Sequence, residues 1–175
     1  DDAVRFADSL GVLMVHGAGN DGDDIDIEDN FPNRNYESGG MAVNWLEVGA
    51  SAPAIGENLA ADFSNYGVNN VDIFAPGVSI YSTVAGNDYT FFNGTSMAAP
   101  VVSGVAALLL SYFPELDASE VKEIILQTST PLGDQIVIKP GSGDEEVVFG
   151  SLSATGGVIN AYEAVKEAAS RSNEE

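Results

Sequence analysis

The chain of 175 residues contains no cysteine, a single histidine and only six lysines and arginines. The absence of cysteine excludes disulfides, thiol catalysis and zinc sites with cysteine ligands. Because the six cationic residues face 27 aspartates and glutamates, the formal net charge is −21, which argues against nucleic-acid binding and against docking to anionic membranes. No apolar run approaches the length of a membrane helix, so no membrane span is expected in this chain.

What is present suits one folded domain. Hydrophobic residues make up 45% of the chain and charged residues 19%, a balance that supports a packed core rather than disorder. Residues 2–10 form a helical pattern, and the apolar run 12–16 that follows predicts a buried strand. A helix followed by a buried strand is half of a βαβ unit, which indicates an α/β fold with a mostly parallel central sheet. Further strands are expected at 45–50 and 71–75, helices at 95–113, 117–128 and 160–169, and hairpins over 79–92 and 136–149.

The segment most able to carry chemistry is Asn93-Gly94-Thr95-Ser96-Met97-Ala98-Ala99-Pro100, between an expected strand and the long apolar helix. Gly94 permits a tight turn before Ser96, and free N–H groups at a helix start can stabilise an oxyanion. In the alternative interpretation, Thr95 or Ser96 is only a helix N-cap. Residues Gly94 to Ala98 also approach the nucleophile elbow of α/β-hydrolases. In those enzymes the triad histidine follows the serine, whereas no histidine follows Ser96 here, so this interpretation is excluded.

The string from Gly94 to Pro100 resembles the nucleophile motif of subtilisin-like serine peptidases, and other segments resemble that family in the right order. The resemblance covers roughly residues 1–130 and 155–166. It implies a three-layer α/β fold, Ser96 as nucleophile, Asn20 of Ala18-Gly19-Asn20 as an oxyanion-hole donor, and a secreted or cell-envelope location. The other matching segments are 48–51, 63–67, 75–83 and 156–161.

The chain departs from the family in its triad partners, since no segment resembles the Asp motif or the His motif that precede the serine. The single histidine, His16, aligns with the strand before the oxyanion loop, so we expect a partly buried, hydrogen-bonded residue rather than the general base. The chain also opens at Asp1, without methionine and already in a helical pattern. We therefore interpret residues 1–175 as the carboxyl-terminal portion of a single peptidase domain. Its expected partners are the missing amino-terminal part and protein or peptide substrates, and the isolated chain should be nearly inactive.

Two more segments are candidate binding sites. Six carboxylates lie within residues 21–29, and Asp24, Asp26 and Glu28 are candidate ligands for calcium, although a solvated loop is the alternative. No other cofactor is expected. By resemblance, Phe31 and Pro32, a pair able to adopt a cis bond, form one side of the primary specificity pocket with Ala18 and Gly19, and a plain turn is the alternative.

Three functions follow from these observations. The first is a serine endopeptidase, of which this chain carries the nucleophile and the oxyanion asparagine. The second is a subtilisin-like scaffold that has lost catalysis, and the third is an acidic calcium-binding module. Retention of both Ser96 and Asn20 favours the first, because a scaffold needs neither.

Overall fold

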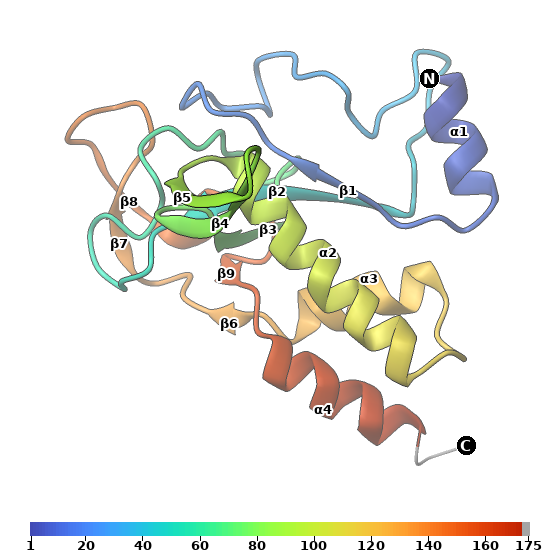
Figure 1. Cartoon of the computed structure of the whole chain (residues 1–175). Helices are drawn as coiled ribbons and strands as arrows, with labels where there is room; N and C mark the ends of the chain where they lie inside the picture. Colours follow the sequence, from blue (N-terminus) through green and yellow to red (C-terminus); the bar gives the residue numbers. More distant parts are fainter. Residues whose placement is uncertain (173–175) are drawn as a thin grey trace.

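A computed structural model describes residues 1–172, and its centre is a five-stranded sheet (Figure 1). The strand order is β1-β2-β3-β9-β6; the first four are parallel and β6 is antiparallel to β9. The α/β class with a mostly parallel sheet is therefore confirmed. The strands are β1 (Met14–Gly17), β2 (Trp45–Ser51), β3 (Ile73–Pro76), β6 (Thr130–Pro131) and β9 (Gly157–Val158).

Helix α2 (Thr95–Tyr112) is the core helix, because it packs across β1, β2 and β3 and buries residues such as Val102 and Leu109 completely. Figure 1 shows α3 (Ala118–Gln127) and α4 (Ala161–Ser172) beside it, below the sheet in this view. Helix α1 (Asp2–Ser9) and the long 18–44 connection lie above the sheet. Within residues 1–172, α2 is also the one helix long and apolar enough to span a membrane, a test that buried helices of soluble proteins pass as well.

Several local predictions are confirmed. The helix expected at 117–128 is α3, and Asp117 and Glu120 form a capping box at its start, each side chain accepting from the other's backbone N–H. Two hairpins are present, β4 (Ile80–Val84) with β5 (Asp88–Phe92) and β7 (Ile136–Ile138) with β8 (Glu146–Val148). A short 3₁₀ helix, η1 (Phe149–Ser151), follows β8.

Other predictions are shifted or wrong. The first strand spans 14–17 rather than 12–16, because its pairing with β2 begins only at Met14, while the Val12 N–H still bonds to the Ala7 carbonyl of α1. The interpretation of Thr95 or Ser96 as the N-cap of α2 is wrong: Gly94 is the N-cap, at φ 152°, and no side chain caps the helix.

The carboxyl-terminal hairpin touches the loop that follows β1 through two glycines. Gly22 and Gly141 both have positive φ, 71° and 72°. A Cβ on Gly22 would lie 2.8 Å from Gly141 Cα, and a Cβ on Gly141 would lie 2.6 Å from the Gly22 carbonyl oxygen. The two turns therefore meet backbone to backbone, which only glycine permits at either position.

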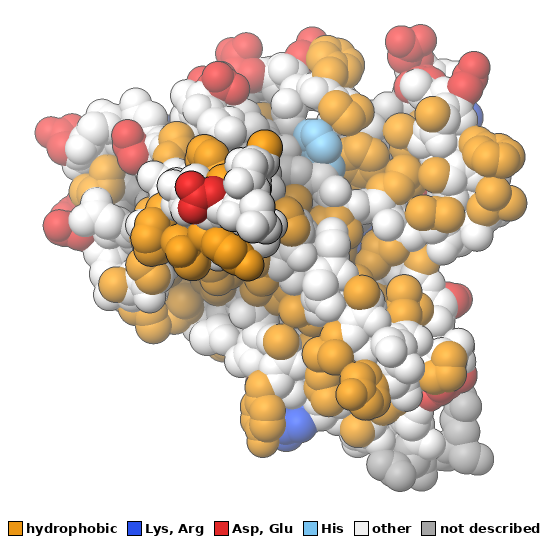
Figure 2. All heavy atoms as spheres, in the orientation of Figure 1, with side chains coloured by type: hydrophobic (Ala, Val, Ile, Leu, Met, Phe, Trp, Pro, Cys, Tyr) orange, Lys and Arg blue, Asp and Glu red, His pale blue; other side chains and the backbone are white. Residues whose placement is uncertain are grey.

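The surface matches the composition. Figure 2 shows acidic side chains around the periphery of one face and apolar side chains over the β4–β5 hairpin. The exposed aromatic residues of that hairpin are Tyr81, Tyr89, Phe91 and Phe92.

Candidate active site

The start of α2 and the loop after β1 meet at one point. Asn20 Oδ1 accepts hydrogen bonds from Thr95 N at 2.9 Å and from Thr95 Oγ1 at 3.1 Å, and Gly19 N donates to Thr95 Oγ1 at 3.2 Å. Thr95 is buried, while Ser96, the next residue, is exposed in the first turn of α2. The structure thus brings together the two residues that the sequence singled out for catalysis, 76 residues apart.

These contacts fix the direction of the Asn20 amide. Because Oδ1 is engaged by two donors on Thr95, the Nδ2 group is the end of the amide left to donate, and both ends lie close to Gly94, at 3.6 and 3.7 Å from a Cβ placed there. Ser96 N–H belongs to the first turn of α2, where the helix offers no intrahelical acceptor. A side-chain amide N–H and a helix N-terminal N–H close to a serine hydroxyl are the elements of an oxyanion site, and here Asn20 contacts the residue before Ser96.

Asn65 holds the backbone of this loop in place, a role that the sequence did not reveal. Its Oδ1 accepts from Asp21 N at 2.9 Å and Asp23 N at 3.0 Å, and its Nδ2 donates to Ala18 O at 2.9 Å. The side chain therefore bridges both ends of the loop that carries Asn20.

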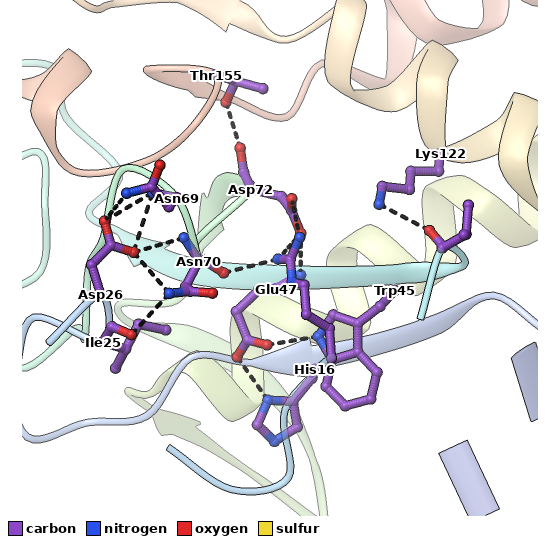
Figure 3. Close-up of polar contacts among 12 residues, drawn as sticks. His16, Ile25, Asp26, Trp45, Glu47, Asn69, Asn70, Asp72, Lys122 and Thr155 are labelled. Atoms are coloured by element: carbon purple, nitrogen blue, oxygen red, sulfur yellow. Dashed lines mark hydrogen bonds and ion pairs between the residues drawn. The ribbon is translucent and has the colours of Figure 1, made fainter. Parts of the chain in front are cut away.

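His16 lies on the other face of β1. A Cβ on Gly17 would be 2.9 Å from the Thr95 backbone, so Gly17 faces α2, and side chains alternate along a strand. His16 therefore points away from α2, where its Nδ1 is 2.7 Å from Glu47 Oε1 (Figure 3). It is the part-buried, hydrogen-bonded histidine that the alignment predicted.

A buried polar network extends from Glu47 across the sheet (Figure 3). Trp45 Nε1 donates to Glu47 Oε2 at 2.7 Å, and Glu47 N donates to Asp72 Oδ2 at 2.7 Å. Arg34 binds both oxygens of Asp72, at 3.0 and 2.6 Å. Desolvation of the partly buried Lys122 ammonium lowers its pKa, against the opposing attraction of Asp72.

Asp8 at the end of α1 anchors the start of β2. Its carboxylate accepts from Asn44 N at 2.8 Å, from Val43 N at 3.2 Å and from the Tyr36 hydroxyl at 3.2 Å. Burial alone would raise the pKa of Asp8, but these hydrogen bonds outweigh it and lower that pKa below its ordinary value.

The acidic loop is tied down by amides. The Asp26 carboxylate accepts hydrogen bonds from the backbone and side-chain amides of both Asn69 and Asn70, and Asp24 Oδ1 accepts from Asp26 N at 3.0 Å. Glu28 is exposed. Across residues 1–172, no three acidic or histidine side chains gather as a metal site would require. Calcium binding at Asp24, Asp26 and Glu28 stays a prediction.

The segment assigned to substrate binding lies beside the end of β1. Asn30 Nδ2 donates to Ala18 O at 3.0 Å, which brings Phe31 and Pro32 next to the Ala18-Gly19 backbone. The Phe31–Pro32 peptide bond is cis, and the Phe31 side chain is 77% exposed.

Comparisons with known proteins agree with this geometry. The sequence profile of the Subtilase family matches residues 1–143. Subtilisin DY of Bacillus licheniformis is 37% identical over 139 residues, which is 79% of this chain and 47% of that protein. A thermostable alkaline protease of Halalkalibacterium halodurans is 42% identical over 131 residues, 75% of this chain and 32% of that protein.

Solved structures point the same way. The self-cleaved protease domain of PatA matches with a TM-score of 0.70 and 28% identity, covering 97% of this chain and 54% of that one. The chain thus spans about half or less of the length of these relatives. Given the profile match, the fold and the placement of Asn20 beside the Ser96 turn, this chain belongs to the Subtilase family, the subtilisin-like serine peptidases.

Proposed function

We propose that the whole protein is a serine endopeptidase, in which this chain is the carboxyl-terminal part of the catalytic domain. Ser96 is the nucleophile and Asn20 donates to the oxyanion. The observation that carries the proposal is the double hydrogen bond from Thr95, the residue before Ser96, to Asn20 Oδ1, which engages the amide oxygen and leaves the Nδ2–H groups to donate.

The steps follow from that arrangement. Ser96 Oγ attacks the scissile carbonyl carbon while its proton passes to a general base, and the carbonyl oxygen becomes an oxyanion. Asn20 Nδ2–H and Ser96 N–H donate to that oxygen, and the positive end of the α2 dipole favours its charge. Protonation of the leaving amine releases the first product, and water then hydrolyses the acyl-enzyme.

The base and the acid that orients it lie outside this chain in our proposal. His16 supports this assignment, because its side chain faces away from α2 and is bound to Glu47. Among residues 1–172, β1 pairs only with β2, so one edge of β1 is free to receive the amino-terminal part of the same domain. Family membership is the basis for proposing a secreted or cell-envelope location and protein or peptide substrates.

A fluorophosphonate probe tests the nucleophile in the full-length protein. We expect labelling that Ser96→Ala abolishes, and a loss of about 10²–10³ in kcat for Asn20→Ala with KM nearly unchanged, as for other oxyanion donors. Asn69→Ala, on the surface and away from α2, is the matched control. No labelling of the full-length protein would instead favour the inactive scaffold.

Fluorophosphonate labelling of the isolated chain tests whether the general base lies outside residues 1–175. Without a base the hydroxyl stays protonated, so we expect very slow labelling. Fast labelling that is lost in His16→Ala would make His16 the base and contradict the proposal.

A further inference from the structure

The carboxyl-terminal β7–β8 hairpin is anchored to one short segment in the middle of the chain. Ile138 N donates to Glu57 O at 2.7 Å, and Gly141 N donates to Asp62 O at 2.9 Å. The first bond comes from the end of β7 and the second from the turn that follows it. The hairpin is therefore attached to the body of the domain at its turn as well as along a strand.

The oxyanion loop, residues 18–23, is anchored to the residues that come next in the same segment. Gly22 N donates to Phe63 O at 3.0 Å, and Tyr66 N donates to Asp23 O at 2.9 Å. The three Asn65 bonds described above add to these two. The hairpin turn and the oxyanion loop thus share one support, residues 57–66.

Buried side chains hold the hairpin against this support. Val137 of β7 and Ala18 at the start of the oxyanion loop are both fully buried in the same apolar cluster. Phe149 and Leu152, which follow β8, belong to that cluster as well. Because protein interiors are close-packed, the hairpin cannot withdraw from the loop without opening a cavity.

The two backbones touch at the hairpin turn. Figure 1 shows the orange turn between β7 and β8 next to the blue loop that follows β1. A Cβ on Gly141 would lie 2.6 Å from the carbonyl oxygen of Gly22, which is two residues beyond Asn20. Since both turns are fixed to residues 57–66, a displacement at Gly141 passes to the backbone that carries Asn20.

We propose that the β7–β8 hairpin is a positioning element of the catalytic site: the turn at Gly141 fixes the Gly22 backbone and, through it, the place of the Asn20 amide. This inference rests on the proposed peptidase function. Gly141 touches neither the substrate nor the reacting atoms, so it is a positioning residue. The Subtilase profile ends at residue 143, so β8 and the side chains that complete the apolar cluster lie beyond the family match.

Gly141→Ala in the full-length enzyme tests the contact, with Gly143→Ala as the matched control. Both glycines lie in the same turn with positive φ, 72° and 85°, so alanine imposes similar backbone strain at either position. A Cβ on Gly143 meets nothing within 4 Å, whereas one on Gly141 meets Gly22. We expect Gly141→Ala to lower kcat about 10- to 100-fold with KM nearly unchanged, because a misplacement of about 1 Å can cost about 10²-fold. Gly143→Ala should leave both constants near those of the wild type.

A double-mutant cycle with Asn20→Ala assigns the effect to the oxyanion donor. Once the Asn20 amide is removed its position no longer matters, so adding Gly141→Ala should lower kcat by less than about twofold further. Full additivity of the two losses would mean that Gly141 acts on another part of the protein, and would overturn the inference.

Thermal unfolding of each variant shows whether it is folded at the assay temperature. If Gly141→Ala does not fold, Val137→Ala, which loosens the same hairpin through a small cavity, takes its place in the cycle. A wild-type kcat for Val137→Ala, or full additivity with Asn20→Ala, then overturns the inference.

The outcomes separate this inference from the proposed function. If Asn20→Ala lowers kcat by the expected factor while Gly141→Ala leaves it unchanged, or if Gly143→Ala lowers it equally, the hairpin has no positioning role. If Asn20→Ala has no effect, or the full-length protein neither cleaves peptides nor reacts with fluorophosphonate, the peptidase proposal fails instead.

Discussion

Replacing Asn65 by alanine should loosen the loop that carries Asn20. The asparagine side chain is buried, at 3% exposure for the residue, and makes three hydrogen bonds to backbone groups of residues 18–23. Alanine removes all three. Asn65 N still donates to Gly19 O at 3.0 Å, so the chain path at position 65 itself should persist.

The size of the effect follows from what each bond leaves behind. A typical hydrogen bond contributes about 1 kcal/mol net, and a buried group left without a partner costs about 1–3 kcal/mol. Ala18 O keeps its bond from Asn30, and Asp21 and Asp23 are exposed enough for water to reach their N–H groups. We therefore expect the lower range, a loss of about 2–3 kcal/mol in the free energy of unfolding.

Urea denaturation of the isolated chain measures this loss, because the midpoint shifts while the slope m stays constant. Hydrogen exchange at the Asp21 and Asp23 amides should accelerate in the variant. Asn69→Ala, which removes one exposed side-chain bond to Asp26, is the control and should cost less than about 1 kcal/mol. A loss below about 0.5 kcal/mol for Asn65→Ala, with unchanged exchange, would refute the reasoning.

Four further predictions concern the charged groups. The folded-state pKa of Asp8 is depressed, so the ionised carboxylate stabilises the fold above its unfolded pKa of about 3.9, and this stabilisation is lost as the pH falls through the folded value. The difference in free energy of unfolding between wild type and Asp8→Ala should therefore shrink between about pH 6 and pH 2. A constant difference would contradict this. Arg34→Met leaves the Asp72 carboxylate buried without its cation and should lower the free energy of unfolding by about 3–5 kcal/mol. Adding Asp72→Asn should recover part of this loss, and a loss below about 1 kcal/mol would show that the pair does not stabilise the fold. Raising NaCl from about 0.1 to 1 M shortens the Debye length from about 10 to 3 Å, so the urea midpoint should rise for a chain of net charge −21, and a fall would argue against self-repulsion. Calorimetric titration with calcium should show binding tighter than millimolar that Asp24→Asn with Asp26→Asn reduces, and a flat titration would remove the site.

Motifs that are contiguous in the sequence could be predicted because their physics is local. The α2 helix follows from 18 successive residues that are nearly all apolar or small, and the capping box of α3 from two residues three apart. The nucleophile turn and the oxyanion loop each lie within a short string.

The contacts that complete the site could not be predicted in the same way, because they depend on the register of the sheet. Thr95 reads as a cap in sequence, yet its hydroxyl and N–H both reach Asn20, 75 residues earlier. Glu47 meets His16 only because β1 and β2 pair in parallel with these two residues opposite each other. Strands β6 and β9, with two residues each, are too short to show any hydrophobic period.

The contact between Gly22 and Gly141 limits how this chain could be recombined with its relatives. Steric conflict between two side chains can be relieved by trimming either one, but here both surfaces are main chain and offer nothing to trim. A hairpin grafted over residues 136–148 must therefore bring a glycine at the position of Gly141, and the recipient loop must keep Gly22. The turn near the end of the family match and the loop that presents Asn20 are exchangeable only as a pair.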